Sequence, residues 1–252
     1  MPLSHLSRAV PDWFQTSNNH DTELLGRTSI ELNDAVGMIE VDLRIRDVNG
    51  EIAVQEQVPG TRFPKTCHER HLQSDKHFCL GLDAGKGIIS FDHAVVWWGL
   101  LNRFLKLQRV AERTKRWPPQ QELAHGNAGH HQIAAFEAAK ELGIENEYMN
   151  MLAGKRAWFS DGNLKVNARG RLHNSWLPCP VGCRKNGKAI ARLGCCKPKA
   201  VATLINEERQ RREKIAAFYR IVRLLLKEQC CGTMLTCGLR DSALTTSSQA
   251  SR

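Results

Sequence analysis

The sequence predicts an α+β fold in which antiparallel strands come first and helices follow. Apolar and polar residues alternate strictly over residues 37–46, and the apolar period lengthens to that of amphipathic helices from Phe91 onward. A cysteine-rich segment, residues 179–196, separates two of the helical stretches. Strands followed by helices are typical of α+β proteins, whereas α/β proteins alternate the two. The 252 residues suffice for a catalytic-sized domain with a smaller appendage.

Residues 37–58 predict an antiparallel hairpin. In the first strand the apolar residues share one face: Ile39, Val41, Leu43 and Ile45. A period of two over this length indicates a half-buried strand. The stretch EIAVQEQV, residues 51–58, predicts the second strand, and residues 47–50 (Asp-Val-Asn-Gly) supply the turn.

Three later stretches predict helices, over residues 91–116, 128–142 and 204–227. Gly143 is a typical residue for the end of the second. We expect the first helix to bury Val96, Leu100, Phe104, Leu107 and Val110, and the last to bury Ile215, Phe218, Ile221, Leu224 and Leu225. The polar tail, residues 238–252, predicts disorder.

The composition limits the classes of partner. The net charge of +10 suits an acidic partner, but the aromatic residues, 6% of the chain, do not interleave with the basic runs as base stacking requires. We therefore favour a solvated basic face over a surface that binds nucleic acid. No apolar run reaches the roughly 18–20 residues of a membrane span, and residues 1–15 lack the apolar core of a secretory signal. We expect a cytoplasmic protein with no membrane partner, whose nine cysteines are reduced or bind metal.

Four cysteines predict a structural zinc site. Cys179, Cys183, Cys195 and Cys196 follow the spacing C-x3-C-x11-C-C, and four thiolates in a short loop-rich segment match a closed tetrahedral site. The alternative is a group of surface thiols without metal. The segment also resembles the SEC-C motif, a short zinc module, in its Cys-Pro, its basic KNGK stretch and its Cys-Cys pair. Both of its intervals are longer than in that motif.

A second cysteine-bearing stretch, CHERHLQSDKHFCLG, spans residues 67–81. Cys79 lies between apolar residues and precedes a glycine, and its residue pattern leaves three interpretations open: a nucleophile, a metal ligand or an inert thiol. The spacing of Cys230, Cys231 and Cys237 requires no metal. Whether these three or Cys67 bind metal stays open.

The order of these features resembles the core of a ubiquitin-conjugating enzyme over about residues 25–145. A hairpin, Phe63-Pro64, a histidine-containing loop, Phe78-Cys79-Leu80 and Trp97-Trp98 at the start of a helix follow one another as in that family. The resemblance implies an antiparallel meander flanked by helices. It also implies that Cys79 forms a thioester with a ubiquitin-like modifier and needs no cofactor for catalysis. His71 lies where the family has the asparagine of His-Pro-Asn, which supports the oxyanion.

Three further residues are candidates for roles around Cys79. His68 either orders the loop or takes part in catalysis. His125 is interpreted as a base or loop anchor, or alternatively as a cap of the helix that starts near Ala128. Asp83 is the second candidate for receiving a proton from the incoming amine.

The resemblance also implies a domain plan and partners. We expect a catalytic core at residues 1–150 and an extension at 151–237 that carries the zinc motif and the basic helix. The expected partners are a ubiquitin-like modifier, an activating enzyme and a JAB-type peptidase of the same operon, in bacterial antiviral defence. Two alternatives stay open: a zinc-dependent nucleic-acid-binding protein and a Cys-His hydrolase that uses Cys79 with His125.

Overall fold

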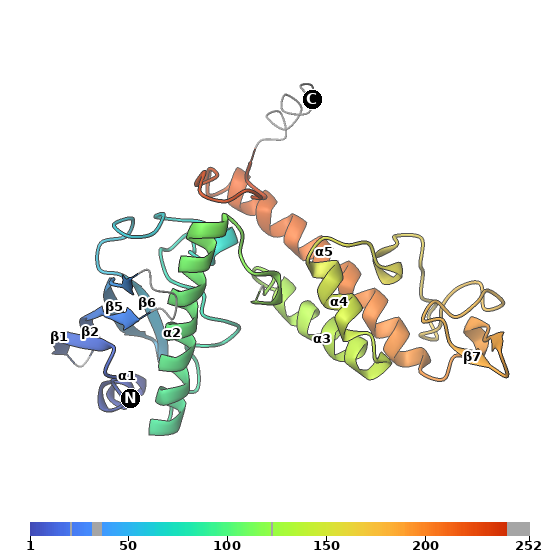
Figure 1. The fold of residues 1–252 in the computed structure, drawn as a ribbon, viewed down its shortest axis with the longest axis horizontal. Coiled ribbons are helices and arrows are strands. Elements are labelled where there is room, and N and C mark those ends of the chain that lie inside the picture. Colours follow the sequence, from blue (N-terminus) through green and yellow to red (C-terminus); the bar gives the residue numbers. More distant parts are fainter. Residues whose placement is uncertain (21, 32–36, 122, 241–252) are drawn as a thin grey trace. The chain divides into compact units, whose positions relative to one another are not determined.

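The computed structural model describes residues 1–20, 22–31, 37–121 and 123–240. The chain forms two compact units (Figure 1). The first comprises residues 1–118 together with the C-terminal segment from residue 223, and the second comprises residues 119–222. The expected core of residues 1–150 thus includes the start of the second unit. Residues 241–252 of the predicted tail lie outside the described residues.

A four-stranded antiparallel sheet in the order β1-β2-β5-β6 forms the first unit's centre (Figure 1). Its strands are β1 (Phe14–His20), β2 (Glu23–Thr28), β5 (Asp42–Val48) and β6 (Glu51–Glu56). A short second pair joins β3 (Ile30–Glu31) to β4 (Met38–Ile39). The α+β prediction is confirmed.

The predicted hairpin is confirmed as β5 and β6. Leu43 and Ile45 are fully buried, as the alternation predicts. Asn49 and Gly50 both have positive φ values, 55° and 85°, the conformation that a two-residue hairpin turn requires. The amide of Gly50 donates to the Asp47 carboxylate at 2.7 Å. The sequence pattern missed β1, because this edge strand is exposed after Phe14 and carries no alternation.

Two helices complete the first unit, α1 (Pro2–Arg8) and α2 (Phe91–Thr114). The Ser90 hydroxyl accepts the amide of His93 and so caps α2. The predicted apolar face of α2 is confirmed at Phe104 and wrong at Val96, which is 63% exposed, and at Val110, which is also exposed. The buried face lies one residue further along the helix and comprises Ala94, Trp97, Trp98, Leu101, Phe104, Leu105, Gln108 and Ala111. The two large indoles decide this orientation, because burying them removes more apolar surface from water than burying two valines.

The second unit is mainly helical, with α3 (Ala128–Leu142), α4 (Glu145–Leu152) and most of α5 (Pro198–Leu224). The bounds of α3 agree with the prediction. Helix α5 begins earlier than predicted, and its buried residues concentrate in its first half, whereas Ile221, Leu224 and Leu225 of the predicted stripe are exposed. A small hairpin, β7 (Arg184–Lys185) and β8 (Lys188–Ala189), lies in the cysteine-rich segment.

Arg70 and Gln108 join the loop before Cys79 to helix α2. The guanidinium donates through Nε to Gln108 Oε1 at 2.8 Å, and Gln108 Nε2 donates to the Arg70 carbonyl at 2.6 Å. Both residues are buried, at 4% and 0% exposure. A buried cation is tolerated only when its donors are satisfied. This reciprocal pair therefore fixes the loop of residues 67–71 on the helix.

A buried carboxylate organises the preceding loop. Glu56, at the end of β6, accepts the amides of Gly60, Arg62 and Phe63 at 2.6–3.2 Å. Three backbone donors compensate for the burial of its charge. Glu56 thus sets the path of the chain from the sheet toward the loop of residues 67–71.

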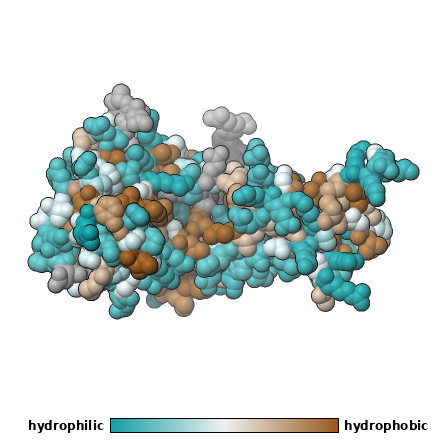
Figure 2. Space-filling view, turned by 90° about the horizontal axis from the view of Figure 1, so that it is seen from below, coloured by the Kyte–Doolittle hydropathy of each residue, from teal (hydrophilic) through white to brown (hydrophobic). Residues whose placement is uncertain are grey.

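The surface mixes polar and apolar atoms. Figure 2 shows apolar side chains between the hydrophilic ones on the face that is drawn. Within the part of the chain that the structure describes, no helix has an apolar stretch long enough to cross a membrane.

The Arg70–Gln108 pair yields a stability prediction. Replacement Gln108→Ala removes the acceptor of the buried Arg70 Nε and the donor to the Arg70 carbonyl, so we expect the free energy of unfolding to fall by about 3 kcal/mol. Denaturant titration measures this change. Lys106→Ala, an exposed position on the same helix, is the control and should change the free energy by less than about 0.5 kcal/mol. Equal effects of the two replacements would contradict the assignment.

Candidate functional site

Cys79 lies on an arch, residues 78–85, that is attached to the edge strand β6 at two points. The amide of Phe78 donates to the Val54 carbonyl at 2.8 Å, and the amide of Ile52 donates to the Gly85 carbonyl at 2.8 Å. β6 ends the sheet order, so its outer edge has backbone groups that the arch uses. The intervening residues leave the strand between these two anchors.

The second anchor requires glycine. A Cβ atom at residue 85 would lie 2.2 Å from the Ile52 carbonyl oxygen. The arch therefore approaches β6 more closely than any side chain would allow.

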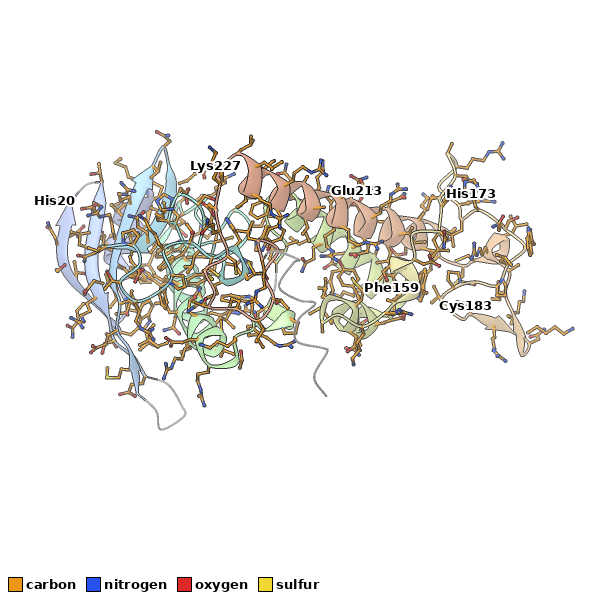
Figure 3. All side chains as sticks on the ribbon, turned by 90° about the horizontal axis from the view of Figure 1, so that it is seen from above. His20, Phe159, His173, Cys183, Glu213 and Lys227 are labelled. Carbon is orange, nitrogen blue, oxygen red and sulfur yellow. The ribbon has the colours of Figure 1, made fainter. Side chains whose placement is uncertain are left out.

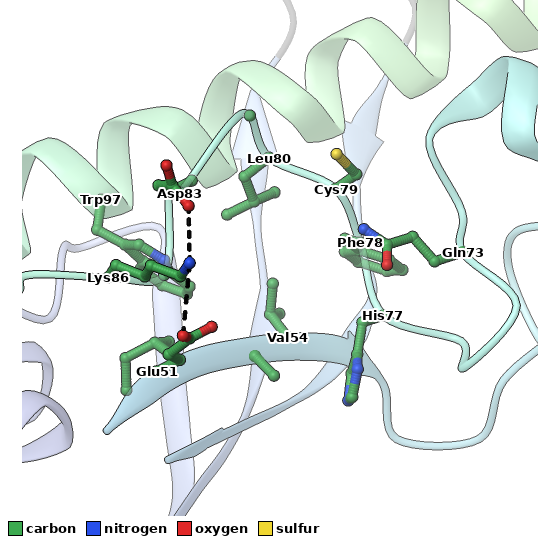
Figure 4. A pocket seen from close by; sticks show the side chains of 15 residues that line it. Glu51, Val54, Gln73, His77, Phe78, Cys79, Leu80, Asp83, Lys86 and Trp97 are labelled. Carbon is green, nitrogen blue, oxygen red and sulfur yellow. Dashed lines mark ion pairs between the residues drawn. The ribbon is translucent and has the colours of Figure 1, made fainter. Parts of the chain in front are cut away.

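An open pocket of about 320 Å³ lies beneath the arch (Figure 4). Its lining includes Gln73, His77, Cys79, Asp83, Lys86 and Trp97. Lys86 pairs with Asp83 at 2.9 Å and with Glu51 at 3.6 Å. Figure 4 shows this charged group on the side of the pocket opposite Gln73. The pocket thus has a charged wall and a wall that carries the thiol.

The surroundings of the Cys79 thiol keep it protonated at neutral pH. Burial raises its pKa, while hydrogen bonds from the Gly81 amide and the Gln73 side chain oppose that shift. The backbone amide of Cys79 donates to the His71 carbonyl at 2.8 Å. The sulfur is thus partly shielded and held in place, and two donors already point at it.

Gln73 is a site residue that the sequence analysis missed. It lies six residues before Cys79, and β-bridges that pair Leu72 with both Cys67 and Phe78 fold its segment back beside the thiol. The one sequence signal was an amide side chain within the histidine-rich stretch, because an amide N–H is a natural oxyanion donor.

His71 and His68 are both buried in the loop before Cys79. The His71 ring packs on Trp117, with ring centroids 4.9 Å apart, and burial, followed by the charge of His68, lowers its pKa to about 4. His71 is therefore neutral at pH 7. His68 Nε2 contacts the Glu228 carboxylate at 2.8 Å, which favours a role in ordering the loop. The catalytic role of His71 stays a prediction.

His125 lies in the second unit. Its ring stacks on Phe218 at 5.1 Å between centroids and meets Tyr219 edge-on. Its carbonyl accepts the amide of Ala128, at the start of α3. The suggested role as a base for the Cys79 reaction stays a prediction.

His77, which the sequence analysis did not select, lines the same pocket as Cys79. Its Nδ1 lies 3.0 Å from the Asp75 carboxylate. Figure 4 shows its ring extending away from the sulfur of Cys79. The Asp75–His77 pair therefore contributes to the pocket wall.

The four predicted zinc cysteines are neighbours in the second unit. Cys183, labelled in Figure 3, precedes β7 and is hydrogen-bonded to Cys179 and Cys196, and Cys195 likewise contacts Cys179. Burial, followed by the neighbouring thiols, raises the pKa of Cys183. The clustered soft donors are compatible with zinc. Among the described residues, however, no group of three or more histidine, cysteine or acidic side chains is arranged to hold a metal ion.

Comparison with known families matches both parts of the chain. Residues 13–119 match a prokaryotic E2 domain, and residues 124–239 match a cysteine-rich domain described as C-terminal to the E2 domain. The searches of curated proteins and of solved structures gave no match. The two family matches follow one another in the expected order, and the chain contains a prokaryotic E2 domain followed by the cysteine-rich domain that lies C-terminal to E2 domains.

Proposed function

We propose that this protein carries the C-terminus of a ubiquitin-like modifier as a thioester on Cys79 and transfers it to an amine. The E2 domain supports a role in ubiquitin-like conjugation and implies a modifier and an activating enzyme as partners. The residues matched by this domain contain two cysteines, Cys67 and Cys79. Cys67 is 4% exposed, whereas Cys79 borders the pocket. The position of Cys79 on the arch is the observation that carries the proposal.

The first step is a thioester exchange. The Cys79 thiol loses its proton, and its sulfur attacks the carbonyl of the thioester that joins the modifier to the activating enzyme. The thiol of the activating enzyme leaves. Because burial raises the pKa of Cys79, the thiolate is a minor species at neutral pH. The Gly81 amide and the Gln73 side chain stabilise it when it forms.

The second step is attack by an amine. A C–N bond forms, the C–S bond breaks and the Cys79 thiol is regenerated. The tetrahedral intermediate carries an oxyanion, and a fixed donor beside the sulfur stabilises it. Gln73 is such a donor, and His71 remains the second candidate. We assign Asp83, which lines the same pocket, to orienting the amine and accepting its proton.

The cysteine-rich domain extends this proposal. We assign one structural zinc ion to Cys179, Cys183, Cys195 and Cys196, where it would close the loops of a segment with little apolar core. The basic helix α5 and this segment then serve to dock a partner. The antiviral setting and the JAB-type peptidase rest on the resemblance of the sequence.

Cys79 variants test the proposal directly. Incubation with a ubiquitin-like modifier, its activating enzyme and ATP should give an adduct that thiols cleave. Cys79→Ser should convert it to a thiol-resistant ester, because an oxygen ester resists thiol exchange, and Cys79→Ala should abolish it. Gel electrophoresis with and without reductant measures the three outcomes. An adduct that persists in Cys79→Ala would contradict the assignment.

Gln73→Ala tests the donor. We expect discharge of the preformed thioester to free lysine to slow roughly 10- to 100-fold. Alkylation of the unloaded Cys79 thiol by iodoacetamide should also slow, because loss of the donor raises the pKa further. In the unchanged protein that alkylation rate should rise about tenfold per pH unit up to the raised pKa.

Gln15→Ala, an exposed amide on β1, is the matched control and should leave both rates unchanged. His71→Ala tests the other candidate, because it removes the ring N–H donor. If His71→Ala slows discharge and Gln73→Ala does not, the donor role belongs to His71.

Metal analysis tests the zinc assignment. The purified full chain should contain about one zinc ion, which the double replacement Cys179→Ser/Cys195→Ser removes. The double replacement Cys230→Ser/Cys237→Ser, outside the cluster, is the control and should retain the ion. Zinc that survives the first double replacement would place the metal elsewhere.

A further inference from the structure

The C-terminal segment, residues 226–240, lies on the core of the first unit beside the loop of residues 67–71. Met234 is 2% exposed and belongs to the core of that unit. The Leu235 amide donates to the Lys115 carbonyl at 2.8 Å, and the Gly238 amide donates to the Glu69 carboxylate at 3.2 Å. The segment is therefore held in position by contacts that do not involve its cysteines.

This placement brings together two cysteines that are 164 residues apart in the chain. The sulfurs of Cys67 and Cys231 lie 2.9 Å apart. A disulfide bond is about 2.05 Å long, so the two atoms need to approach by less than about 1 Å to form one. The flanking His68–Glu228 contact, at 2.8 Å, holds the same two segments together.

The surroundings of the pair favour a thiolate on Cys231. The hydrogen bond with Cys67 lowers the pKa of Cys231, and burial opposes this shift; contacts with the hydroxyl and amide of Thr233 and the charge of Arg70 also lower the pKa. The pKa of Cys67 is raised by its hydrogen bond with Cys231 and by burial. Cys231 is also the more exposed of the two. The pair thus consists of an accessible thiolate and a buried resolving thiol.

We propose that Cys67 and Cys231 form a redox-active pair that low-molecular-weight disulfides oxidise. The Cys231 thiolate attacks one sulfur of the small disulfide and releases one thiolate. Cys67 then gives up its proton and attacks Cys231 Sγ in the mixed disulfide, which releases the second thiolate. In sum, two protein thiols and one small disulfide give one protein disulfide and two small thiols.

The geometry favours this pair over the other cysteines of the segment. Cys230 and Cys237 contact each other, but both belong to the C-terminal segment, so a bond between them would not join it to the core. The Cys67–Cys231 bond would attach the segment to the loop whose His71 carbonyl accepts the Cys79 amide.

The test uses glutathione disulfide as the oxidant and the full chain as the substrate, without any modifier or activating enzyme. After the reaction is quenched with an alkylating reagent, peptide mapping under non-reducing conditions should identify a linked pair of peptides that contain Cys67 and Cys231. The mass should fall by two hydrogen atoms. The melting temperature should rise by roughly 5 °C, because the bond closes a very long loop, and dithiothreitol should reverse both changes.

Variants separate this pair from the remaining thiols. Cys231→Ser should abolish the linked peptides and the rise in melting temperature, and Cys67 of that variant should carry no glutathione adduct, because the buried thiol has lost the partner that delivers the oxidant. Cys230→Ser/Cys237→Ser should keep the linkage. A stable glutathione adduct on Cys231 of the unchanged protein without linkage, or linkage of Cys231 to Cys230 or Cys237, would overturn the proposal. Zinc lost in Cys231→Ser would also overturn it, since it would make the pair a metal site.

Discussion

The reciprocal hydrogen bonds between Arg70 and Gln108 hold the loop that lies between the two cysteine sites of the first unit. A buried guanidinium must find acceptors, and the ones available are the side chain and backbone carbonyl of a glutamine on the buried face of α2. The loop that carries Arg70 is therefore fixed on the helix. Its His71 carbonyl then holds the amide of Cys79, and the charge of Arg70 favours the thiolate of Cys231. One buried cation thus affects both cysteine sites.

The surroundings of Cys79 combine two demands that oppose each other. A thioester lasts longer where water is partly excluded, but the same burial raises the pKa of the thiol and lowers the thiolate population. The site compensates with directed donors, the Gly81 amide and the Gln73 side chain. This arrangement suits a thiol that must be unreactive toward stray electrophiles and reactive toward one docked carbonyl.

Local sequence patterns were sufficient to predict those elements whose structure a local interaction determines. The alternation around Leu43, the Asn49-Gly50 turn and the glycine after α3 are short-range signals, and the structure confirms the elements they predicted. The buried face of α2 was predicted wrongly at its valines, because it depends on how Trp97 and Trp98 fit the rest of the unit. The indole of Trp98, for example, donates to the Leu6 carbonyl of α1. Strand β1 was missed because its side chains are mostly exposed.

The sequence likewise predicted only part of the candidate site. Cys79 could be selected from the order of motifs along the chain, and the four clustered cysteines from their spacing. Gln73 could not, because its approach to the sulfur depends on the backbone pairing of Leu72 with Phe78. The Cys67–Cys231 pair was beyond any sequence pattern, since its members meet only when the C-terminal segment returns to the core.

Locating the modifier on the loaded protein tests the thioester on Cys79 most directly. The loaded chain would be digested at acidic pH without reductant, and mass spectrometry would identify the cysteine joined to the modifier's C-terminal residue. We expect this cysteine to be Cys79. A modifier found instead on Cys67, on Cys231 or on a cysteine of residues 179–196 would contradict it.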